Sequence, residues 1–271
     1  MRRFAQICAL LVLAGCSNTV QLGNERNIDL QTGFTPAGIA LSNSMPDLIR
    51  RTSPSYVTLI VHKQRGNDRL SRDILPEAVT SGSGFVLDNE GHILTAGHVA
   101  VSPGYTANAT GADGRVYEGK VIAVRADDDS AIIKLAGFKG SPVHPTSNAC
   151  LRSGEAIFSL GKPHARGDTA RTGEVQSMSF GRAVTYNGFG YPDAMVLRMS
   201  TKKGESGGPV FNSNGELSGM LVSTLSDGGG RPLHLAHAIG TPSLARFVCK
   251  HTSCSKGWRS LSKQSLKGCP A

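Results

Sequence analysis

Short stretches in which apolar and polar residues alternate recur along most of the chain. This alternation predicts half-buried strands at residues 56–63, 84–87, 92–95, 116–125, 131–135, 156–160, 173–178, 194–199, 209–211, 216–223 and 233–239. Turns rich in Gly, Asn, Asp and Pro separate them at intervals of roughly 8–20 residues. Such spacing is typical of an antiparallel sandwich or barrel, not of alternating strands and helices. An all-β fold is therefore expected.

Three segments depart from this pattern. Residues 241–251 predict a short C-terminal helix, with Thr241 as N-cap and Pro242 at the first helical position. A short helical turn is expected just before the strand at residue 56. Residues 17–44 are polar and show no sustained period, which predicts a flexible tether.

The first residues have the character of an export signal. A positive start at Arg2 and Arg3 precedes an apolar run over residues 4–13, which is too short to span a bilayer. The run ends in LAGC, which resembles the lipobox of bacterial lipoproteins. This resemblance implies a signal peptide over residues 1–15 and a lipid anchor on Cys16; an ordinary secretory signal is the alternative. Ser17 lacks the aspartate that commonly retains lipoproteins at the inner membrane. We therefore expect attachment to the bacterial cell envelope, facing the periplasm and at the outer membrane.

Export to an oxidising compartment favours disulfides among the cysteines that remain in the mature chain. These are Cys150, Cys249, Cys254 and Cys269, whose three possible pairings the sequence does not distinguish. Their spacing does not suit a zinc site, and we expect no metal and no other cofactor.

The net charge of +9 comes from lysines and arginines dispersed along the chain. Because no basic run is interleaved with aromatic residues, no nucleic-acid partner is expected. A content of 39% hydrophobic and 18% charged residues suits a globular unit.

The stretch KGESGGPVFN, residues 203–212, crowds three glycines around Ser206. Serine is a weak nucleophile until a base takes its proton, most often a histidine oriented by a carboxylate. Both partners are available: LTAGHV places His98 just after a strand, and DDDSAIIKL places Asp129 at the head of an apolar strand. The pattern predicts a Ser-His-Asp triad.

Five stretches carry a family resemblance: SGSGFVLDNEGHILTAGHV, DDDSAIIKL, TGEVQSMSFGR, GESGGPVFNSNGELSGM and HAIGTPSLARF. Over about residues 56–248 the chain resembles the protease domain of trypsin-like, HtrA/Deg-type serine proteases. The resemblance implies two six-stranded antiparallel β-barrels with the active site in the cleft between them. It implies a protease domain over residues 45–250, with barrels at about 45–140 and 141–240. A cysteine-containing tail over residues 251–271 would follow.

The resemblance also assigns roles to residues. Ser206 is the implied nucleophile, His98 the general base and acid, and Asp129 the residue that holds the histidine. The backbone N–H groups of Gly204 and Ser206 would form the oxyanion hole, with glycine allowing the necessary turn. Of the three consecutive aspartates, Asp129 is the one that aligns with the aspartate preceding the strand in the family. The implied activity is endopeptidase cleavage of exported or envelope proteins through an acyl-enzyme.

The implied walls of the primary specificity pocket are Ser200, Thr201, Val222, Ser223, Thr224 and His237. No aspartate stands six residues before Ser206, so we expect a preference for small-to-medium aliphatic residues and not for Lys or Arg. His237 has two readings, an acid-accepting role or ordinary packing. His234 and His237 are three apart in a strand, so they point to opposite faces and make a poor metal pair. The other histidines without a partner pattern are interpreted as surface or structural residues: His62, His92, His144, His164 and His251.

The chain departs from the family pattern in features that concern regulation. HtrA-type enzymes usually carry PDZ domains after the protease domain, whereas only residues 252–271 follow the last predicted helix. We expect this tail to be stapled to the second barrel through Cys150 or Cys249. Glu205 stands where vertebrate trypsins have an aspartate that pairs with a new N-terminus. No activation sequence precedes the barrel, so no zymogen cleavage within the fold is expected.

Two other functions are compatible with parts of the sequence. GESGG also satisfies G-x-S-x-G, the nucleophile elbow of α/β-hydrolases, but that elbow needs a helix directly after the serine. Gly207, Gly208 and Pro209 would break such a helix. The second alternative is a membrane-tethered binding protein with a protease fold and little activity. The sequence does not indicate an oligomeric state.

Overall fold

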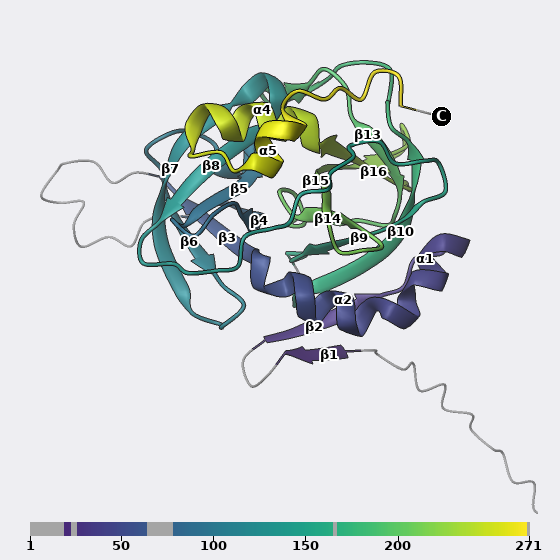
Figure 1. The fold of residues 1–271 in the computed structure, drawn as a ribbon, viewed down its shortest axis with the longest axis horizontal. Helices are drawn as coiled ribbons and strands as arrows, with labels where there is room; N and C mark the ends of the chain where they lie inside the picture. Colours follow the sequence, from purple (N-terminus) through teal and green to yellow (C-terminus); the bar gives the residue numbers. More distant parts are fainter. Residues whose placement is uncertain (1–18, 23–25, 64–77, 165–166, 270–271) are drawn as a thin grey trace, which may run out of the picture.

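The computed structural model describes residues 19–22, 26–63, 78–164 and 167–269. Most of these residues form two β-barrels lying side by side, as Figure 1 shows. The predicted signal peptide and Cys16 lie outside the described residues. Among the described residues, no helix is both long and apolar enough to cross a membrane.

The first barrel is a closed ring of six antiparallel strands. It consists of β3 (Tyr56–His62), β4 (Ala78–Val86), β5 (His92–Ala96), β6 (Thr106–Thr110), β7 (Val116–Arg125) and β8 (Ser130–Leu135). Their order around the ring is β3-β4-β5-β8-β7-β6. Side chains such as Leu59, Phe85 and Ile93 are almost completely buried. The alternation in the sequence is the pattern expected of strands with one face on such a core.

The second barrel is built in the same way. Its strands are β9 (Ala156–Gly161), β10 (Thr169–Ser177), β13 (Met195–Arg198), β14 (Pro209–Asn212), β15 (Leu217–Ser226) and β16 (Pro232–Gly240). The ring closes because β9 pairs with both β10 and β14. A second buried cluster, which includes Val175, Leu197 and Leu221, forms its core. The predicted fold of two six-stranded antiparallel barrels is confirmed.

The N-terminal segment differs from the sequence-based expectation. It contains β1 (Thr19–Leu22), β2 (Arg26–Gln31), α1 (Pro36–Leu41) and α2 (Met45–Thr52). Strand β2 pairs in parallel with β10, and Ile28 is completely buried. The prediction of a flexible tether over residues 17–44 was therefore wrong at residues 19–22 and from residue 26 onwards. Burial of Ile28 and Leu41 against the second barrel stabilises a segment too irregular to show a period.

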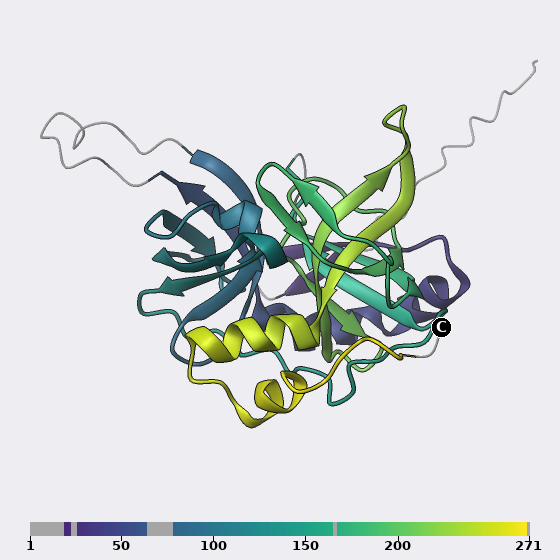
Figure 2. The same cartoon turned by 90° about the horizontal axis from the view of Figure 1, so that it is seen from above.

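The remaining elements connect or cover the barrels. A hairpin of β11 (Val184–Tyr186) and β12 (Phe189–Tyr191) interrupts the second barrel between β10 and β13. The helices are α3 (Gly97–Ala100), α4 (Thr241–His251) and α5 (Lys256–Leu261), with 3₁₀ turns at Ser42–Ser44, Ser53–Ser55 and Ala126–Asp128. Figure 2 shows α4 running from the second barrel across to the first. Helix α4 covers the predicted C-terminal helix, but its N-cap is Gly240 and not the predicted Thr241, which is the first helical residue.

Candidate active site

His98 and Asp129 meet because of the register between two strands of the first barrel. Strands β5 and β8 are antiparallel with Ala96 opposite Ser130, so the residues that follow β5 face the residue that precedes β8. Asp129 is fully buried and adopts a left-handed backbone with φ 38°. Its Oδ2 lies 2.9 Å from His98 Nδ1, and its Oδ1 accepts the His98 backbone N–H at 2.9 Å.

This contact fixes the chemistry of the imidazole. A carboxylate only accepts hydrogen bonds, so Nδ1 of His98 carries the proton that points to Asp129. In the neutral ring Nε2 is then the unprotonated nitrogen, which can act as a base. The side chain of His98 is 25% exposed, so the ring is accessible from one side while its partner is fully enclosed.

The neighbouring aspartates have other surroundings. Asp128 is ion-paired with Arg125 and accepts hydrogen bonds from Ser243 of α4. Asp127 is exposed. Of the three consecutive aspartates, Asp129 is thus the one that contacts the imidazole, and Asp128 connects the first barrel to α4.

The loop that carries Ser206 leaves the second barrel and lies against the first. The carbonyl of Ser206 accepts the backbone N–H of Ser83 in β4 at 2.8 Å. A Cβ at Gly207 would lie 2.2 Å from the Ser83 carbonyl and 2.3 Å from Thr95 Oγ1. Because Thr95 belongs to β5, which leads directly into His98, the serine loop and the histidine share one junction between the barrels.

The Ser206 hydroxyl has a partner other than the imidazole. Its Oγ donates to the carbonyl of Val222 at 3.3 Å, and no hydrogen bond joins it to His98 in the described structure. Transfer of its proton to Nε2 therefore requires the hydroxyl to leave the Val222 carbonyl.

Two backbone N–H groups of the serine loop, those of Gly204 and of Ser206 itself, have no acceptor among the described residues. Within the described part of the chain, neither the N–H of Gly204 nor that of Ser206 donates a hydrogen bond. The carbonyl of Lys203 accepts the His164 N–H at 3.0 Å. In a trans peptide C=O and N–H point in opposite directions, so the Gly204 N–H points away from His164. Gly204 has φ 98°, a conformation that favours glycine.

Glu205, between these two residues, is held by a cation from β10. Arg171 Nε lies 2.5 Å from Glu205 Oε1, and the Lys202 N–H donates to Oε2 at 2.7 Å. Both side chains are buried. Burial raises the pKa of Glu205, and Arg171 acts in the opposite direction. The ion-pair partner of Glu205 is therefore Arg171, a residue that the sequence pattern did not indicate.

The predicted specificity residues divide between the two faces of the second barrel. Thr201 and Thr224 face each other with their hydroxyl oxygens 2.7 Å apart. Thr224 lies opposite Ala236 in the β15–β16 pair, and its own side chain is exposed. Ser200 binds His234 through Oγ and Nδ1 at 2.7 Å. Val222 supplies the carbonyl that holds Ser206.

Ser223 and His237 lie on the other face, because successive side chains of a strand point to opposite sides. His237 Nδ1 lies 2.9 Å from the Tyr191 hydroxyl, which also contacts Ser223 Oγ at 3.0 Å. The Phe180 ring packs against His237 with centroids 4.3 Å apart. Burial lowers the pKa of His237. His237 therefore has the environment of a packed residue, and the assignment of Ser223 and His237 to the specificity pocket stays a prediction.

One contact at the site was not expected from the sequence. The hydroxyl of Tyr186 in β11 donates to Asp129 Oδ2 and lies 3.2 Å from His98 Nδ1. A signal for the hairpin existed, because Asn187 and Gly188 between aromatic residues form a turn typical of hairpins. The φ values at these positions are 47° and 81°. Nothing in the local sequence, however, indicates that the hairpin contacts the other barrel.

A group with metal-ligand chemistry occurs at the turn between β4 and β5. Donor atoms of Asp88, Glu90 and His92 lie within 4.8 Å of one another. The Asp88 carboxylate is already used: it accepts the backbone N–H groups of Glu90 and His92 and contacts His92 Nδ1 at 2.6 Å. These hydrogen bonds stabilise the turn and explain why the Asp88 and His92 side chains lie close together.

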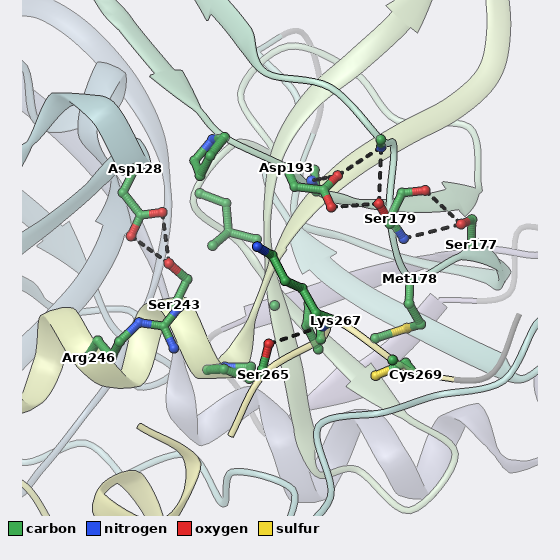
Figure 3. A pocket seen from close by; sticks show the side chains of 18 residues that line it. Asp128, Ser177, Met178, Ser179, Asp193, Ser243, Arg246, Ser265, Lys267 and Cys269 are labelled. Carbon is green, nitrogen blue, oxygen red and sulfur yellow. Dashed lines mark hydrogen bonds between the residues drawn. The ribbon is translucent and has the colours of Figure 1, made fainter. Parts of the chain in front are cut away.

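A cavity of about 730 Å³ lies apart from the histidine and the serine, between α4, the C-terminal tail and the base of the β11–β12 hairpin. Its lining mixes both charges, with Asp128, Asp193, Arg246 and Lys267 among the residues drawn in Figure 3. None of His98, Asp129 and Ser206 lines it.

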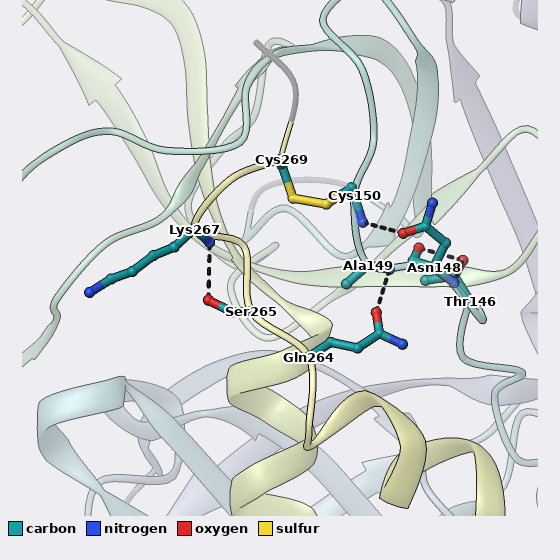
Figure 4. Close-up of a disulfide and its surroundings, with 8 residues drawn as sticks. All are labelled: Thr146, Asn148, Ala149, Cys150, Gln264, Ser265, Lys267 and Cys269. Carbon is teal, nitrogen blue, oxygen red and sulfur yellow. Dashed lines mark hydrogen bonds between the residues drawn. A yellow bond between two sulfur atoms is a disulfide. The ribbon is translucent and has the colours of Figure 1, made fainter.

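The C-terminal tail that forms one wall of this cavity is fixed covalently. A disulfide joins Cys150 to Cys269, and a second joins Cys249 to Cys254. Figure 4 shows the first bridge beside a hydrogen bond of 3.1 Å from the Ala149 N–H to Gln264 Oε1. Both cysteines of the tail, Cys254 and Cys269, are therefore paired. Cys269 is bonded to Cys150, which precedes the first strand of the second barrel.

Comparisons with known proteins bear on this geometry. The sequence profile of the family described as "Trypsin-like peptidase domain" matches residues 82–220. "Protease Do-like 1, chloroplastic" of Arabidopsis thaliana is 30% identical over 188 residues, which cover 67% of this chain and 42% of that protein. "Probable periplasmic serine endoprotease DegP-like" of Brucella suis is 30% identical over 201 residues, covering 72% of this chain and 38% of that protein. The chain thus spans about two fifths of the length of these relatives.

Solved structures share the fold. The HtrA-type protease AlgW with a tripeptide superimposes with a TM-score of 0.61 at 22% identity, covering 75% of this chain and 61% of that chain. The Rv3671c protein of M. tuberculosis, in an inactive form, gives a TM-score of 0.62 at 19% identity and covers 82% of this chain and 96% of that chain. At these identities the likeness concerns the fold.

Proposed function

Because the chain belongs to the trypsin-like peptidase family, we propose that it is a serine endopeptidase that cleaves exported or envelope proteins. The observation that supports this most is the His98–Asp129 pair at the junction where the serine loop crosses between barrels. A buried carboxylate fixes the tautomer of an accessible imidazole, which is the requirement for a general base beside a nucleophile.

The proposed reaction begins when the Ser206 hydroxyl leaves the Val222 carbonyl and turns toward Nε2 of His98. Nε2 takes the proton while Oγ attacks the scissile carbonyl carbon. The resulting imidazolium is held by Asp129 and returns the proton to the leaving amine as the C–N bond breaks. Water then hydrolyses the acyl-enzyme, with His98 again acting as the base.

The unpartnered N–H groups of Gly204 and Ser206 are the proposed donors to the oxyanion. Each such donor is worth on the order of 3 kcal/mol in the barrier, because it is already oriented when charge develops on the oxygen. The Glu205–Arg171 pair lies directly behind this backbone and holds it from the interior.

The proposed substrates have small-to-medium aliphatic residues on the acyl side of the cleaved bond. The Thr201–Thr224 contact supports this, because two bonded hydroxyl side chains facing each other leave little depth for a long side chain. Cleavage-site profiling on a peptide library tests the proposal. Cleavage mainly after Lys, Arg or large aromatic residues would contradict it.

A fluorophosphonate probe on purified protein tests the proposed activity, with Ser206→Ala as the control. We expect labelling of the wild type, none of Ser206→Ala, and cleavage of casein by the wild type alone. Esterase activity without peptide cleavage would indicate another class of serine hydrolase.

A membrane-tethered binding protein with little activity is the second candidate. The Ser206–Val222 hydrogen bond favours it, since the hydroxyl is engaged away from the base. Absence of Ser206-dependent labelling, with the protein folded, would select this candidate over the peptidase.

For the location we propose the bacterial envelope, with residues 1–15 removed and Cys16 lipidated. The LAGC motif supports this, and the two disulfides suit an oxidising compartment. Metabolic labelling with palmitate should mark the wild type and not Cys16→Ala, and fractionation should find the labelled protein in the outer membrane. A soluble, unlabelled wild type would contradict the anchor.

A further inference from the structure

The β11–β12 hairpin joins the two barrels at the histidine. It leaves the second barrel after β10, and its side chains contact residues of the first. The rings of Tyr186 and His98 meet edge to face with centroids 5.5 Å apart, and the Phe189 ring lies 6.5 Å from His98. At the other end, Tyr191 binds Ser223 and His237 of the second barrel.

Tyr186 is the residue of the hairpin that reaches the reacting pair. Its hydroxyl donates to Oδ2 of Asp129, the same oxygen that His98 Nδ1 contacts at 2.9 Å. The Tyr186 oxygen itself lies 3.2 Å from Nδ1. One hydroxyl group therefore touches both members of the pair.

The Asp129 carboxylate depends on this donor. It is fully buried, and in the described structure no lysine or arginine forms an ion pair with it. A buried carboxylate is costly unless hydrogen bonds satisfy it, and the donors here are the backbone N–H and Nδ1 of His98 and the hydroxyl of Tyr186. Tyr186 is the donor that does not belong to the histidine.

The ionisation of Tyr186 suits this role. The titratable groups that face its hydroxyl are Asp129, His98 and Tyr191. Burial, together with the charge of Asp129, raises the pKa of Tyr186 far above its ordinary value. The hydroxyl consequently stays protonated and remains a donor over the whole range in which a peptidase works.

We infer that Tyr186 is a positioning residue for the proposed peptidase reaction, orienting Asp129 so that one of its oxygens is held for the Nδ1 proton of His98. The inference rests on the proposed function. The hydroxyl also withdraws charge from the carboxylate, which tempers the hold of Asp129 on the imidazolium that forms during turnover. The hairpin thereby makes the geometry of a pair in the first barrel depend on a segment of the second.

Tyr186→Phe tests the inference, because it removes the hydroxyl and keeps the ring. We expect kcat to fall roughly 10- to 100-fold, the range for loss of a hydrogen bond to a charged group, with KM little changed. The acidic limb of the pH profile of kcat/KM should move to higher pH, because a carboxylate without this donor holds the imidazolium more strongly.

Tyr191→Phe is the matched control. It removes a hydroxyl from the same hairpin that bonds to His237 and Ser223 and not to the pair. We expect its kcat and pH profile to match the wild type. Equal losses in the two variants, or an unchanged pH profile in Tyr186→Phe, would overturn the inference, because either result would indicate only support of the hairpin.

A second readout does not need activity. In the Ser206→Ala background, the low-field proton signal of the His98 imidazole N–H should move in Tyr186→Phe and stay in place in Tyr191→Phe. If the wild type shows no Ser206-dependent labelling, the proposed function fails while this signal still decides whether the hydroxyl acts on the pair. An unmoved signal would refute the contact.

Discussion

Two carboxylates are fully buried near the junction of the barrels, and they are satisfied in opposite ways. Asp129 accepts hydrogen bonds from the backbone N–H and Nδ1 of His98 and from the Tyr186 hydroxyl, and no lysine or arginine of the described residues pairs with it. Glu205 lies 2.5 Å from the guanidinium of Arg171 and also accepts a backbone N–H. The two acids are similar in burial and differ in countercharge.

Under the proposed function, this difference separates an acid that takes part in the reaction from one that supports the loop. Arg171, a permanent cation, neutralises the charge of Glu205. The contribution of Glu205 is therefore to hold the conformation of the loop that carries Ser206. Asp129 has no lysine or arginine partner among the described residues, and in the proposed reaction its charge faces the imidazole when that ring takes up the serine proton. A buried acid without a resident cation is thus the one prepared for transient charge.

The largest expected effect follows from removing the charge of Asp129. In Asp129→Asn the amide can donate to Nδ1, which favours the wrong tautomer of His98, and we expect kcat to fall about 10⁴-fold. Initial-rate assays with a peptide substrate measure kcat, and Glu205→Gln is the comparison variant. A loss of less than about tenfold in Asp129→Asn would remove the distinction between the two acids.

Breaking the second pair should act on stability. Arg171→Met leaves Glu205 buried without its cation, and we expect the free energy of unfolding to fall by about 3–5 kcal/mol. Urea denaturation measures it. Adding Glu205→Leu should recover much of the loss, because two apolar residues need no countercharge.

The matched control is Arg198→Met. Arg198 pairs with Glu174 at 3.3 Å, but its side chain is 48% exposed, so its loss should cost about 1 kcal/mol or less. Similar losses in the two arginine variants would mean that burial does not set the value of the Glu205 pair.

The smallest expected effect concerns a buried base. Burial lowers the pKa of His237, so the unfolded chain takes up a proton before the folded protein as the pH falls below about 6.5. The stability that neutral His237 contributes is present above that value and is lost as the pH falls toward its folded pKa. The slope is at most about 1.4 kcal/mol per pH unit.

Urea titrations at a series of pH values, compared with His237→Gln, measure this slope. The variant should lack the part of the acid sensitivity that lies just below the ordinary histidine range. Parallel curves for the two proteins would show that His237 does not titrate differently on unfolding.

The sequence predicted the barrels well wherever strands carry large apolar side chains. Strand β7 has the predicted bounds, since Val121 and its neighbours alternate clearly. Strand β6 was missed because its sequence, TANAT, buries only Ala107 and Ala109. Small buried residues provide little periodic signal, although they fill an inward-facing position as well as large ones do.

The candidate site was predictable only in part, for a related reason. His98, Asp129 and Ser206 stand in local motifs, and each motif could be read on its own. Tyr186 and Arg171 act through contacts with segments 57 and 34 residues away in the chain, which no local pattern announces. The burial of Ile28 was not predicted, because most of the residues around it are polar and the segment shows no apolar period.

The bridge between Cys150 and Cys269 divides the chain into two topologically different parts. Ser206 and every strand of the second barrel lie within residues 150–269, which the disulfide closes into a covalent ring. His98 and Asp129 lie outside this ring, in the linear part of the chain that precedes Cys150. A single peptide-bond cut inside the ring would leave the pieces linked through sulfur, and a cut before residue 150 would release a fragment. Self-digestion would therefore be visible on a non-reducing gel when it strikes the first barrel and hidden when it strikes the second.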